Sequence, residues 1–411
     1  MPESVSTTQT GSLPRPDALI EQNRALRKGD IDARAHAAQL EAAVADVVKR
    51  QREIGIAVVG DGEYGKSMSQ KVDYGAWWSY SFQRLGGLEL GSFDLMRDSP
   101  RAKRARARTP PNTGAVQLAS FGERRDWQRF AEAYADPNAG VAPRAAGAER
   151  PALFPTCTGP LEYTGHAAIA ADIAHFKSAL KANGLATGFM TSIAPGSCSR
   201  IGNAYYETDE AFLYACADAM RAEYRAIIDA DLILQIDDPS IAENWDMIVP
   251  EPDVEDYRRF TRMRIDALNH ALKGLPTERI RFHLCWGSWH GPHTTDIALR
   301  DIVDLMLAVD ASAYLFEAGN VRHEHEWRVW EEVKLPEGKT LVPGVVSHAT
   351  NVVEHPELVA DRIERYARLV GRANVMAGTD CGLGGRVHPQ IAWAKLESLV
   401  AGAARVSRRR F

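Results

Sequence analysis

The sequence predicts an α/β fold, a (β/α)8 TIM barrel that carries one long loop insertion. Short apolar runs that end in Gly, Pro or Asp alternate with long helical patterns, and this alternation is typical of repeated strand-helix units. Polar residues stand at the ends of several apolar runs, where a barrel places its active site. A doubly wound open sheet is the alternative, which the lack of a glycine-rich dinucleotide turn after the first run disfavours.

Nine apolar runs qualify as strands, and a barrel needs eight, so one of them is expected to lie outside it. Which one is left open. The strand candidates are residues 8–13, 57–60, 161–164, 188–193, 232–236, 280–285, 313–316, 341–346 and 374–377. The main helical patterns between them cover residues 33–55, 210–230, 254–272 and 356–371.

The domain organisation follows from this rhythm. The 411 residues are enough to bury a large core, and we expect one catalytic domain over residues 1–411. Residues 73–159 break the alternation and are rich in Pro, Arg and aromatic residues. We interpret them as an insertion over the mouth of the barrel and not as a second domain.

Composition limits the functional classes. A formal net charge of −5 argues against nucleic acid as a partner, and the basic stretch 101–108 is interpreted as a solvated loop. We find no apolar run long enough to span a membrane and no secretion signal pattern, so a cytosolic protein is expected. The five cysteines are odd in number and widely spread, which favours reduced thiols and metal ligation over disulfides. A homo-oligomer is left open.

A metal site is indicated by the run that contains His283 and Cys285. These residues stand two apart in a predicted strand, so both side chains point to the same face, and sulfur with imidazole favours zinc. Glu317 and Cys381 each follow another apolar run. Together the four residues would complete a Zn²⁺ ligand set.

The joint placement of polar residues at predicted strand ends carries more weight than any one residue. A lone His or Cys on an apolar strand is more often packed and inert, whereas four zinc-type ligands at successive strand ends favour a site. A closed zinc site that only stabilises the fold is the alternative. The strand-end residues are Ser12, Glu63, Asp237, Asp238, His283, Cys285, Glu317, His348, Asp380 and Cys381.

The ligand types indicate a class of chemistry. Zinc held by two thiolates, one imidazole and one carboxylate has no spare tetrahedral position unless a ligand leaves. If a substrate thiol replaces the glutamate, the metal lowers the pKa of that thiol and presents a thiolate at neutral pH. This is the logic of a thiol alkyltransferase, whereas thiolate-rich ligation would weaken the metal of a zinc hydrolase.

Several motifs resemble those of the catalytic domain of cobalamin-independent methionine synthase. They are the runs 10–15, 62–63 and 235–239, the His283-Leu284-Cys285 pair and the run 380–382. Within this superfamily, longer segments resemble the epoxyalkane:coenzyme M transferases, and the similarity extends over nearly the whole chain. These segments are residues 72–78, 85–87, 285–293, 322–330 and 381–386.

The resemblance implies specific roles. The zinc ligands of the family correspond to His283, Cys285, Cys381 and, by its place after a strand, Glu317. His348 corresponds to a proton-donating histidine, although it comes one position early.

Substrate-binding roles are implied for Ser12, Glu63, Lys66 and Asp237. In the synthases, the carboxylates that match Glu63 and Asp237 are thought to hold the amine of homocysteine. Coenzyme M has a thiol and a sulfonate but no amine, so the cation of Lys66 is a candidate partner for the sulfonate.

The expected reaction is the opening of a short-chain epoxide by the zinc-activated thiol of coenzyme M. The alternative from the same chemistry is methyl transfer from methyltetrahydrofolate to homocysteine, and a third reading is a zinc-stabilised binding protein without turnover. Residues 323–326, His-Glu-His-Glu, resemble a metal motif by composition alone. We interpret them as a helix start or a loop ion-pair cluster.

Overall fold

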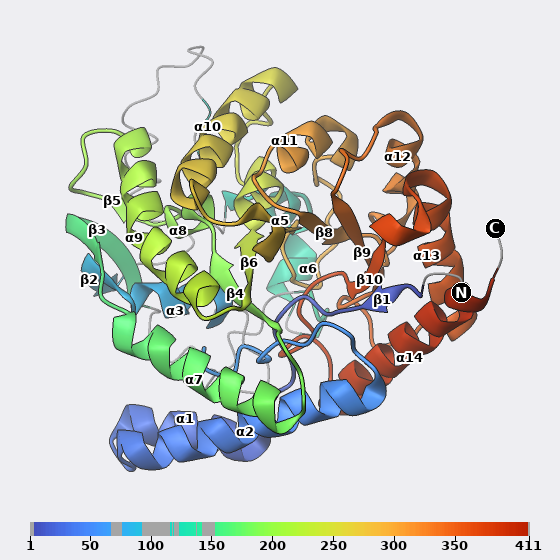
Figure 1. The fold of residues 1–411 in the computed structure, drawn as a ribbon. Coiled ribbons are helices and arrows are strands. Elements are labelled where there is room, and N and C mark those ends of the chain that lie inside the picture. Colours follow the sequence, from blue (N-terminus) through green and yellow to red (C-terminus); the bar gives the residue numbers. More distant parts are fainter. Residues whose placement is uncertain are drawn as a thin grey trace.

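The main sheet of the protein is a curled layer of seven parallel strands. The computed structural model describes residues 4–66, 76–92, 116, 118, 123–136, 138–141 and 153–409. The strand order is β1-β10-β9-β8-β7-β6-β4 (Figure 1). Every residue of β4 and β7 is buried, as expected for parallel strands covered on both faces. The strands are β1 Ser6–Thr7, β4 Phe189–Ile193, β6 Ile233–Asp238, β7 Ile280–Leu284, β8 Ala313–Glu317, β9 Thr340–Val346 and β10 Met376–Thr379.

Residues 57–60 lie between the two edge strands of this sheet. Val58 forms an isolated parallel bridge with Thr8, next to β1, and Gly60 forms one with Phe189 of β4. The backbone N–H of Val58 donates to Thr7 O at 3.0 Å, and the N–H of Phe189 donates to Val59 O at 2.9 Å. The sheet therefore curls far enough for this short segment to contact both of its edges.

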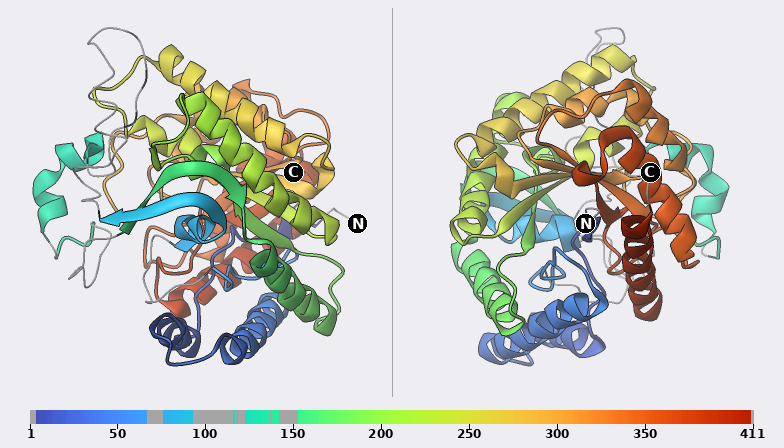
Figure 2. Two further views of the ribbon diagram at one scale, coloured as in Figure 1. Left: turned by 90° about the vertical axis from the view of Figure 1, so that its left-hand side faces the viewer. Right: turned by 45° about the vertical axis from the view of Figure 1, so that its right-hand side comes forward.

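A second, smaller sheet contains the strands β2 Leu85–Ser92, β3 Leu153–Tyr163 and β5 Gly202–Asn203. β2 and β3 are antiparallel and form a twisted ribbon beside the helix α9, Asp209–Asp229 (Figure 2). The predicted strand 161–164 belongs to this sheet, so it is the candidate that lies outside the main one.

Helices pack around the curled sheet (Figure 2). Side chains cap the N-termini of three of these helices. The carboxylate of Asp32 accepts a hydrogen bond from Ala35 N at the start of α2, Ala33–Ile54. Thr208 and Asp253 cap α9 and α10, Val254–Leu272, in the same way. The other helices are α1 Asp17–Lys28, α3 Ala76–Phe82, α5 Arg125–Arg129, α6 Ala131–Ala135, α7 His166–Ala182, α8 Pro195–Cys198, α11 Val303–Leu307, α12 Val329–Glu332, α13 Pro356–Val370 and α14 Pro389–Arg408.

The α/β class predicted from the sequence is confirmed, and most predicted elements agree with the structure to within two residues. Three predicted strands differ: 8–13, where the strand is Ser6–Thr7, 161–164, where it is Leu153–Tyr163, and 57–60, which form only isolated bridges. The predicted basic loop 101–108 and about half of the predicted insertion 73–159 lie outside the described residues. Within the described residues, no helix combines the length and apolarity that crossing a membrane requires.

One described part of the insertion packs against loops that follow the strands. Asp126, in α5, accepts hydrogen bonds from Tyr134 Oη at 2.8 Å and from Thr294 N at 2.9 Å. Tyr134 Oη in turn accepts from Trp289 Nε1 at 2.8 Å. The segment around α5 and α6 is thus joined to the loop after β7, which carries Cys285.

Candidate metal centre

Five neighbouring strands bring the predicted site residues to one end of the sheet. His283 is in β7, Cys285 directly follows it, and Glu317 is the last residue of β8. Cys381 stands two residues after the end of β10. Because these strands are parallel neighbours in the order β10-β9-β8-β7-β6, their carboxyl ends meet at one edge.

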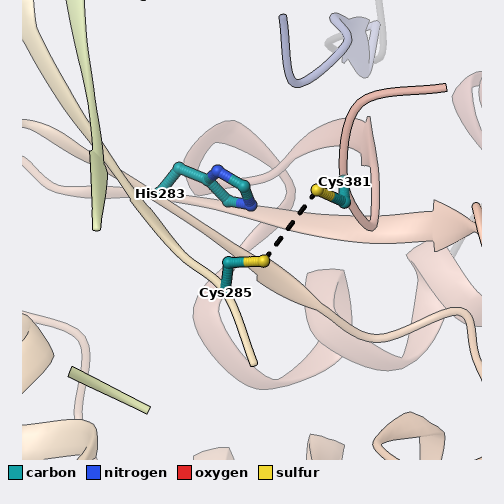
Figure 3. A group of neighbouring side chains, drawn as sticks. All are labelled: His283, Cys285 and Cys381. Carbon is teal, nitrogen blue, oxygen red and sulfur yellow. Dashed lines mark hydrogen bonds between the residues drawn. The ribbon is translucent and has the colours of Figure 1, made fainter. Parts of the chain in front are cut away.

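The imidazole of His283 and the thiols of Cys285 and Cys381 point toward one another (Figure 3). The two sulfur atoms are 3.9 Å apart, and one ligand atom from each of the three residues lies within 4.8 Å of the others. Two zinc–sulfur bonds of about 2.3 Å at a tetrahedral angle hold their sulfurs roughly 3.8 Å apart. The observed separation of the thiols is therefore the one that zinc requires.

The orientation of His283 also suits a metal ligand. Its Nδ1 lies 3.0 Å from Asp237 Oδ1, across the register pair of β6 and β7. Its Nε2 is buried and has no hydrogen-bond partner among the residues that the structure describes. A buried polar atom without a partner is costly, and a carboxylate on the other ring nitrogen is the usual support of a metal-bound histidine. These three side chains fit zinc.

Glu317 lies beside the cluster, where several groups bind its carboxylate. Its Oε1 is 3.9 Å from Cys285 Sγ and accepts from Trp286 N at 3.1 Å. Its Oε2 accepts from Asn320 Nδ2 and Arg322 Nη2, both at 2.7 Å. Burial raises the pKa of Glu317, but the charge and hydrogen bond of Arg322, together with the nearby His348 and His323, outweigh burial and bring the pKa to about 2. The carboxylate is thus ionised and available as a fourth ligand.

The thiols of the cluster differ in acidity. The hydrogen bond with Cys285 lowers the pKa of Cys381, and the nearby charges of His283 and Arg386 lower it further. The same hydrogen bond, together with burial, raises the pKa of Cys285.

A second group of ligand-type side chains adjoins the first. Atoms of Glu317, His348 and Asp380 lie within 4.8 Å of one another. Both ring nitrogens of His348 are buried and find no partner within the described part of the chain, and burial lowers the pKa of this histidine well below its ordinary value. Asp380 accepts from the backbone N–H groups of Ala318 and Gly319 at 2.8 Å, while burial and the Glu317 charge raise its pKa to about 7.

The predicted substrate-binding residues lie in the loops around this centre. Ser12 packs against Gly382, next to Cys381, and its carbonyl accepts from Leu383 N at 2.9 Å. Glu63 is buried, and its Oε1 accepts from Thr191 Oγ1 at 2.7 Å. Lys66 contacts Glu63 and Thr191 instead of standing free in the site.

Asp237 is also engaged within the protein. Its Oδ1 accepts from Gln235 Nε2 at 2.7 Å, besides its contact with His283. Its position is therefore that of a carboxylate that orients a ligand histidine.

The run 323–326 forms an ion-pair network and not a metal site of its own. His323 Nδ1 lies 2.7 Å from Glu326 Oε2, and its Nε2 lies 3.3 Å from Asp296 Oδ2. Glu324 instead pairs with Arg362 at 2.7 Å. The structure agrees with the interpretation of this run as a loop ion-pair cluster.

Three residues that contact the site were not predicted from the sequence. Asn320 and Arg322 bind Glu317, and Thr191 binds Glu63 and Lys66. The position of Asn320 and Arg322 just after Glu317 is a signal that could have identified them. Thr191 offers no such signal, because a threonine within an apolar run is ordinary in a strand.

Comparison with known proteins identifies the class. Residues 144–405 match the family described as "Cobalamin-independent synthase, Catalytic domain", and the chain belongs to this family. It is 23% identical over 403 residues to a 5-methyltetrahydropteroyltriglutamate–homocysteine methyltransferase of Vibrio vulnificus, covering 97% of this chain and 42% of that protein. It is 24% identical over 207 residues to a methionine synthase of Thermococcus kodakarensis, covering 50% and 53%. The chain thus spans about half the length of these two relatives.

A further relative is a 2-hydroxypropyl-CoM lyase of Xanthobacter autotrophicus, 24% identical over 427 residues, with 96% of this chain and 88% of that protein covered. Among solved structures, a B12-independent methionine synthase from Shewanella sp. W3-18-1 in complex with selenomethionine has a TM-score of 0.67 at 18% identity, with 98% of both chains covered. A putative vitamin-B12 independent methionine synthase from Listeria monocytogenes has a TM-score of 0.63 at 17% identity, with 98% and 99% covered. These structural likenesses establish the fold.

Proposed function

We propose that this protein is a zinc-dependent thiol alkyltransferase that uses coenzyme M, or a similar small thiol, to open a short-chain epoxide. The observation that carries the proposal is the cluster of His283, Cys285 and Cys381, in which a buried imidazole nitrogen without a partner faces two thiols 3.9 Å apart. The similarity to the 2-hydroxypropyl-CoM lyase, which covers 88% of that protein, supports the choice of thiol and alkyl donor.

In this proposal His283, Cys285 and Cys381 hold the metal, and Glu317 is the displaceable fourth ligand. Zinc bound there lowers the pKa of a substrate thiol, so that a thiolate is present at neutral pH. Arg322 and Asn320 bind Glu317 Oε2, so these residues would hold the carboxylate beside the cluster. Asp237 keeps the His283 ring in the orientation that directs Nε2 to the cluster.

The chemical step is a ring opening. The thiolate sulfur forms a bond with the less hindered epoxide carbon, the carbon–oxygen bond breaks, and its electron pair stays on the oxygen. His348 would accept the proton that the thiol loses and then deliver it to the alkoxide, so the step needs no further proton. The burial of His348 and its closeness to Glu317 support this role, because a proton donor must lie within reach of the reacting oxygen.

We also propose that the curled sheet is a closed (β/α)8 barrel in which residues 57–60 act as the eighth strand. The isolated bridges of Val58 and Gly60 to Thr8 and Phe189 support this closure. The insertion 73–159 would then cover the end of the barrel that carries the site. The contacts of Asp126 and Tyr134 with the loop after β7 support that placement.

Methyl transfer from methyltetrahydrofolate to homocysteine is the second candidate. The similarity to the Vibrio and Thermococcus relatives favours it, and Glu63 and Asp237 are carboxylates of the kind that could hold an amino group. Both carboxylates, however, already contact groups of the protein itself. The epoxide reaction is therefore the first choice.

The experiment is to follow thiol consumption by zinc-loaded protein with epoxypropane, with coenzyme M and homocysteine in parallel reactions. Loss of the coenzyme M thiol alone is the expected result. No loss of either thiol with the epoxide, together with methylation of homocysteine by methyltetrahydrofolate, would replace the proposal with the second candidate.

A further inference from the structure

The side chain of Lys66 lies inside the protein, against two polar groups and one aromatic ring. Its Nζ is 2.5 Å from Thr191 Oγ1 and 3.5 Å from Glu63 Oε1. The ammonium also lies 4.3 Å from the centroid of the Tyr80 ring, a favourable position for a cation. Lys66 is only 6% exposed and Glu63 only 4%. Lysines are rarely buried to this extent unless they are paired.

The backbone that carries this pair is fixed by its own contacts. Glu63 has a φ of 60°, a left-handed conformation that a residue with a side chain adopts only when its surroundings require it. Arg15 donates to the carbonyl oxygens of both Glu63 and Lys66, and Glu63 N donates to Asp61 Oδ1 at 2.9 Å. The turn therefore holds the carboxylate and the ammonium in a defined position.

Two chains of contacts connect this pair to the cluster of His283, Cys285 and Cys381. Thr191 in β4 is the register partner of Gln235 in β6. Gln235 donates to Asp237 Oδ1, the atom that also contacts His283. The loop that contains Gly11 and Ser12 forms the second connection. Gly11 packs closely against Glu63, since a Cβ on Gly11 would lie 2.7 Å from Glu63 Oε1. Its neighbour Ser12 packs against Gly382, which follows Cys381 in the chain.

We propose that Lys66 is a built-in ammonium group that occupies the cation site of Glu63, and that it thereby selects thiol substrates that carry no amino group. The inference rests on the proposed thiol transferase function and specifies its substrate class. A thiol with its own ammonium would bring a second positive charge next to Lys66, and like charges in a buried site repel strongly. A thiol with only an anionic or neutral tail meets no such repulsion.

Asp237, the other carboxylate near His283, does not offer an alternative binding site for a substrate amine. Asp237 Oδ1 already contacts both His283 Nδ1 and Gln235 Nε2. Removing the carboxylate from His283 to bind a substrate amine would release the ring that the metal requires. Selection against amines therefore depends on Lys66.

The test uses two thiols that differ only in the amino group, homocysteine and 4-mercaptobutanoate. Their dissociation constants with zinc-loaded protein are measured by isothermal titration calorimetry, without any alkyl donor. The wild type is expected to bind 4-mercaptobutanoate at least tenfold more tightly. In Lys66→Met, which keeps the length of the side chain without its charge, Glu63 becomes free to bind an ammonium, so this preference is expected to fall at least tenfold.

Two control variants separate charge selection from general damage. Glu63→Gln/Lys66→Met removes the repelling ammonium and also the carboxylate that could bind a substrate ammonium, so the preference for 4-mercaptobutanoate should fall less than in Lys66→Met. Lys49→Met removes a lysine from an exposed pair with Glu53 and should change nothing. If Lys66→Met does not fold, as judged by circular dichroism, Lys66→Gln, which can still contact Thr191, takes its place.

Equal binding of both thiols by the wild type would overturn the inference, and so would an unchanged preference in the folded Lys66 variant. Failure of the proposed function gives a different result. Thiol binding with the expected preference but no thiol consumption with epoxypropane or another alkyl donor would refute the transferase activity alone. Zinc-dependent consumption of both thiols at equal rates and equal affinities would refute only the selection by Lys66.

Discussion

Two pairs of buried histidines lie close together at the carboxyl ends of the strands, and they differ in what their ring nitrogens contact. His293 lies 3.1 Å from Asp296 through Nδ1 and 3.1 Å from Trp289 O through Nε2, and His323 contacts Glu326 and Asp296. In contrast, counting only partners in the described ranges, His283 has one ring nitrogen without a partner and His348 has two.

The difference separates structural histidines from those available for chemistry. A buried polar atom in a native structure normally has a partner, and a site that binds a metal or a substrate must leave atoms available for it. His283 is in β7 and His348 follows β9, whereas His293 and His323 lie in loops after β7 and β8. What distinguishes them is the set of contacts that the fold leaves unmade.

The largest effect is expected where the metal ligands themselves are changed. Cys285→Ser should remove zinc and activity together, with a loss of at least about a thousandfold in thiol consumption, because a neutral hydroxyl is a poor replacement for a thiolate ligand. Zinc content and thiol consumption are measured on the same sample. Cys216→Ser, a change at a buried cysteine of α9, should keep its zinc, and full activity in zinc-free Cys285→Ser would refute the assignment.

A smaller effect is expected at His348. His348→Gln should lower the turnover rate by about a hundredfold to ten-thousandfold, the usual contribution of a general acid or base, and zinc content should not change. The control is His325→Gln, at an exposed position in the neighbouring loop. If the His348 variant loses zinc instead, this histidine belongs with the ligands and not with the proton donors.

The next effect is expected when the contact between Asp237 and the His283 ring is removed. Asp237→Asn should weaken zinc binding by about tenfold to a hundredfold, as expected when the carboxylate behind a ligand histidine is lost. Competition with a chelator of known affinity measures the change. Unaltered zinc affinity would mean that the contact between Asp237 and His283 does not orient the metal ligand.

The smallest effect tests the paired histidines through pH. Burial lowers the pKa of His323, but its hydrogen bonds with Asp296 and Glu326 raise it to about 9. Because the pKa is raised on folding, the stabilisation is complete below about pH 6.5 and is lost as the pH rises through 9. Between pH 7 and 8 the loss is about 1 kcal/mol.

The free energy of unfolding of the wild type should fall between pH 7 and 8 by about 1 kcal/mol more than that of His323→Gln. Other titrating groups contribute equally to both proteins, so the difference between the proteins isolates His323. Chemical denaturation at each pH provides the measurement. The same pH dependence in both proteins would show that His323 is not the group responsible.

Much of the fold could be predicted because buried parallel strands are short apolar runs. Strands β7, β8 and β9 agree with the predicted ranges to within one residue, and the predicted helix 254–272 is identical with α10. The prediction of a strand over residues 8–13 was wrong, because the strand ends at Thr7. Ser12 and Leu13 instead form a loop that contacts residues 382–384 and Gly62. The pairing of β2 with β3 could not be read locally, because it joins residues far apart in the sequence.

The candidate site was predictable to the extent that strand periodicity controls it. His283 and Cys285 share a face because they stand two apart, and Cys381 follows a strand of the same sheet. The contacts of Lys66 were not predictable, since its partner Thr191 is 125 residues away in the sequence. The sequence suggested a cation open to a sulfonate, whereas the structure has an ammonium engaged by the protein.

One measurement decides whether zinc at this cluster drives turnover: thiol consumption before and after zinc removal by a chelator, with circular dichroism of the same samples. We predict a folded, inactive apo-protein that regains activity when zinc is returned. Activity that survives complete zinc removal would contradict the proposed mechanism. Unfolding on zinc removal, in a protein that never consumed thiol, would mean that the metal only stabilises the fold.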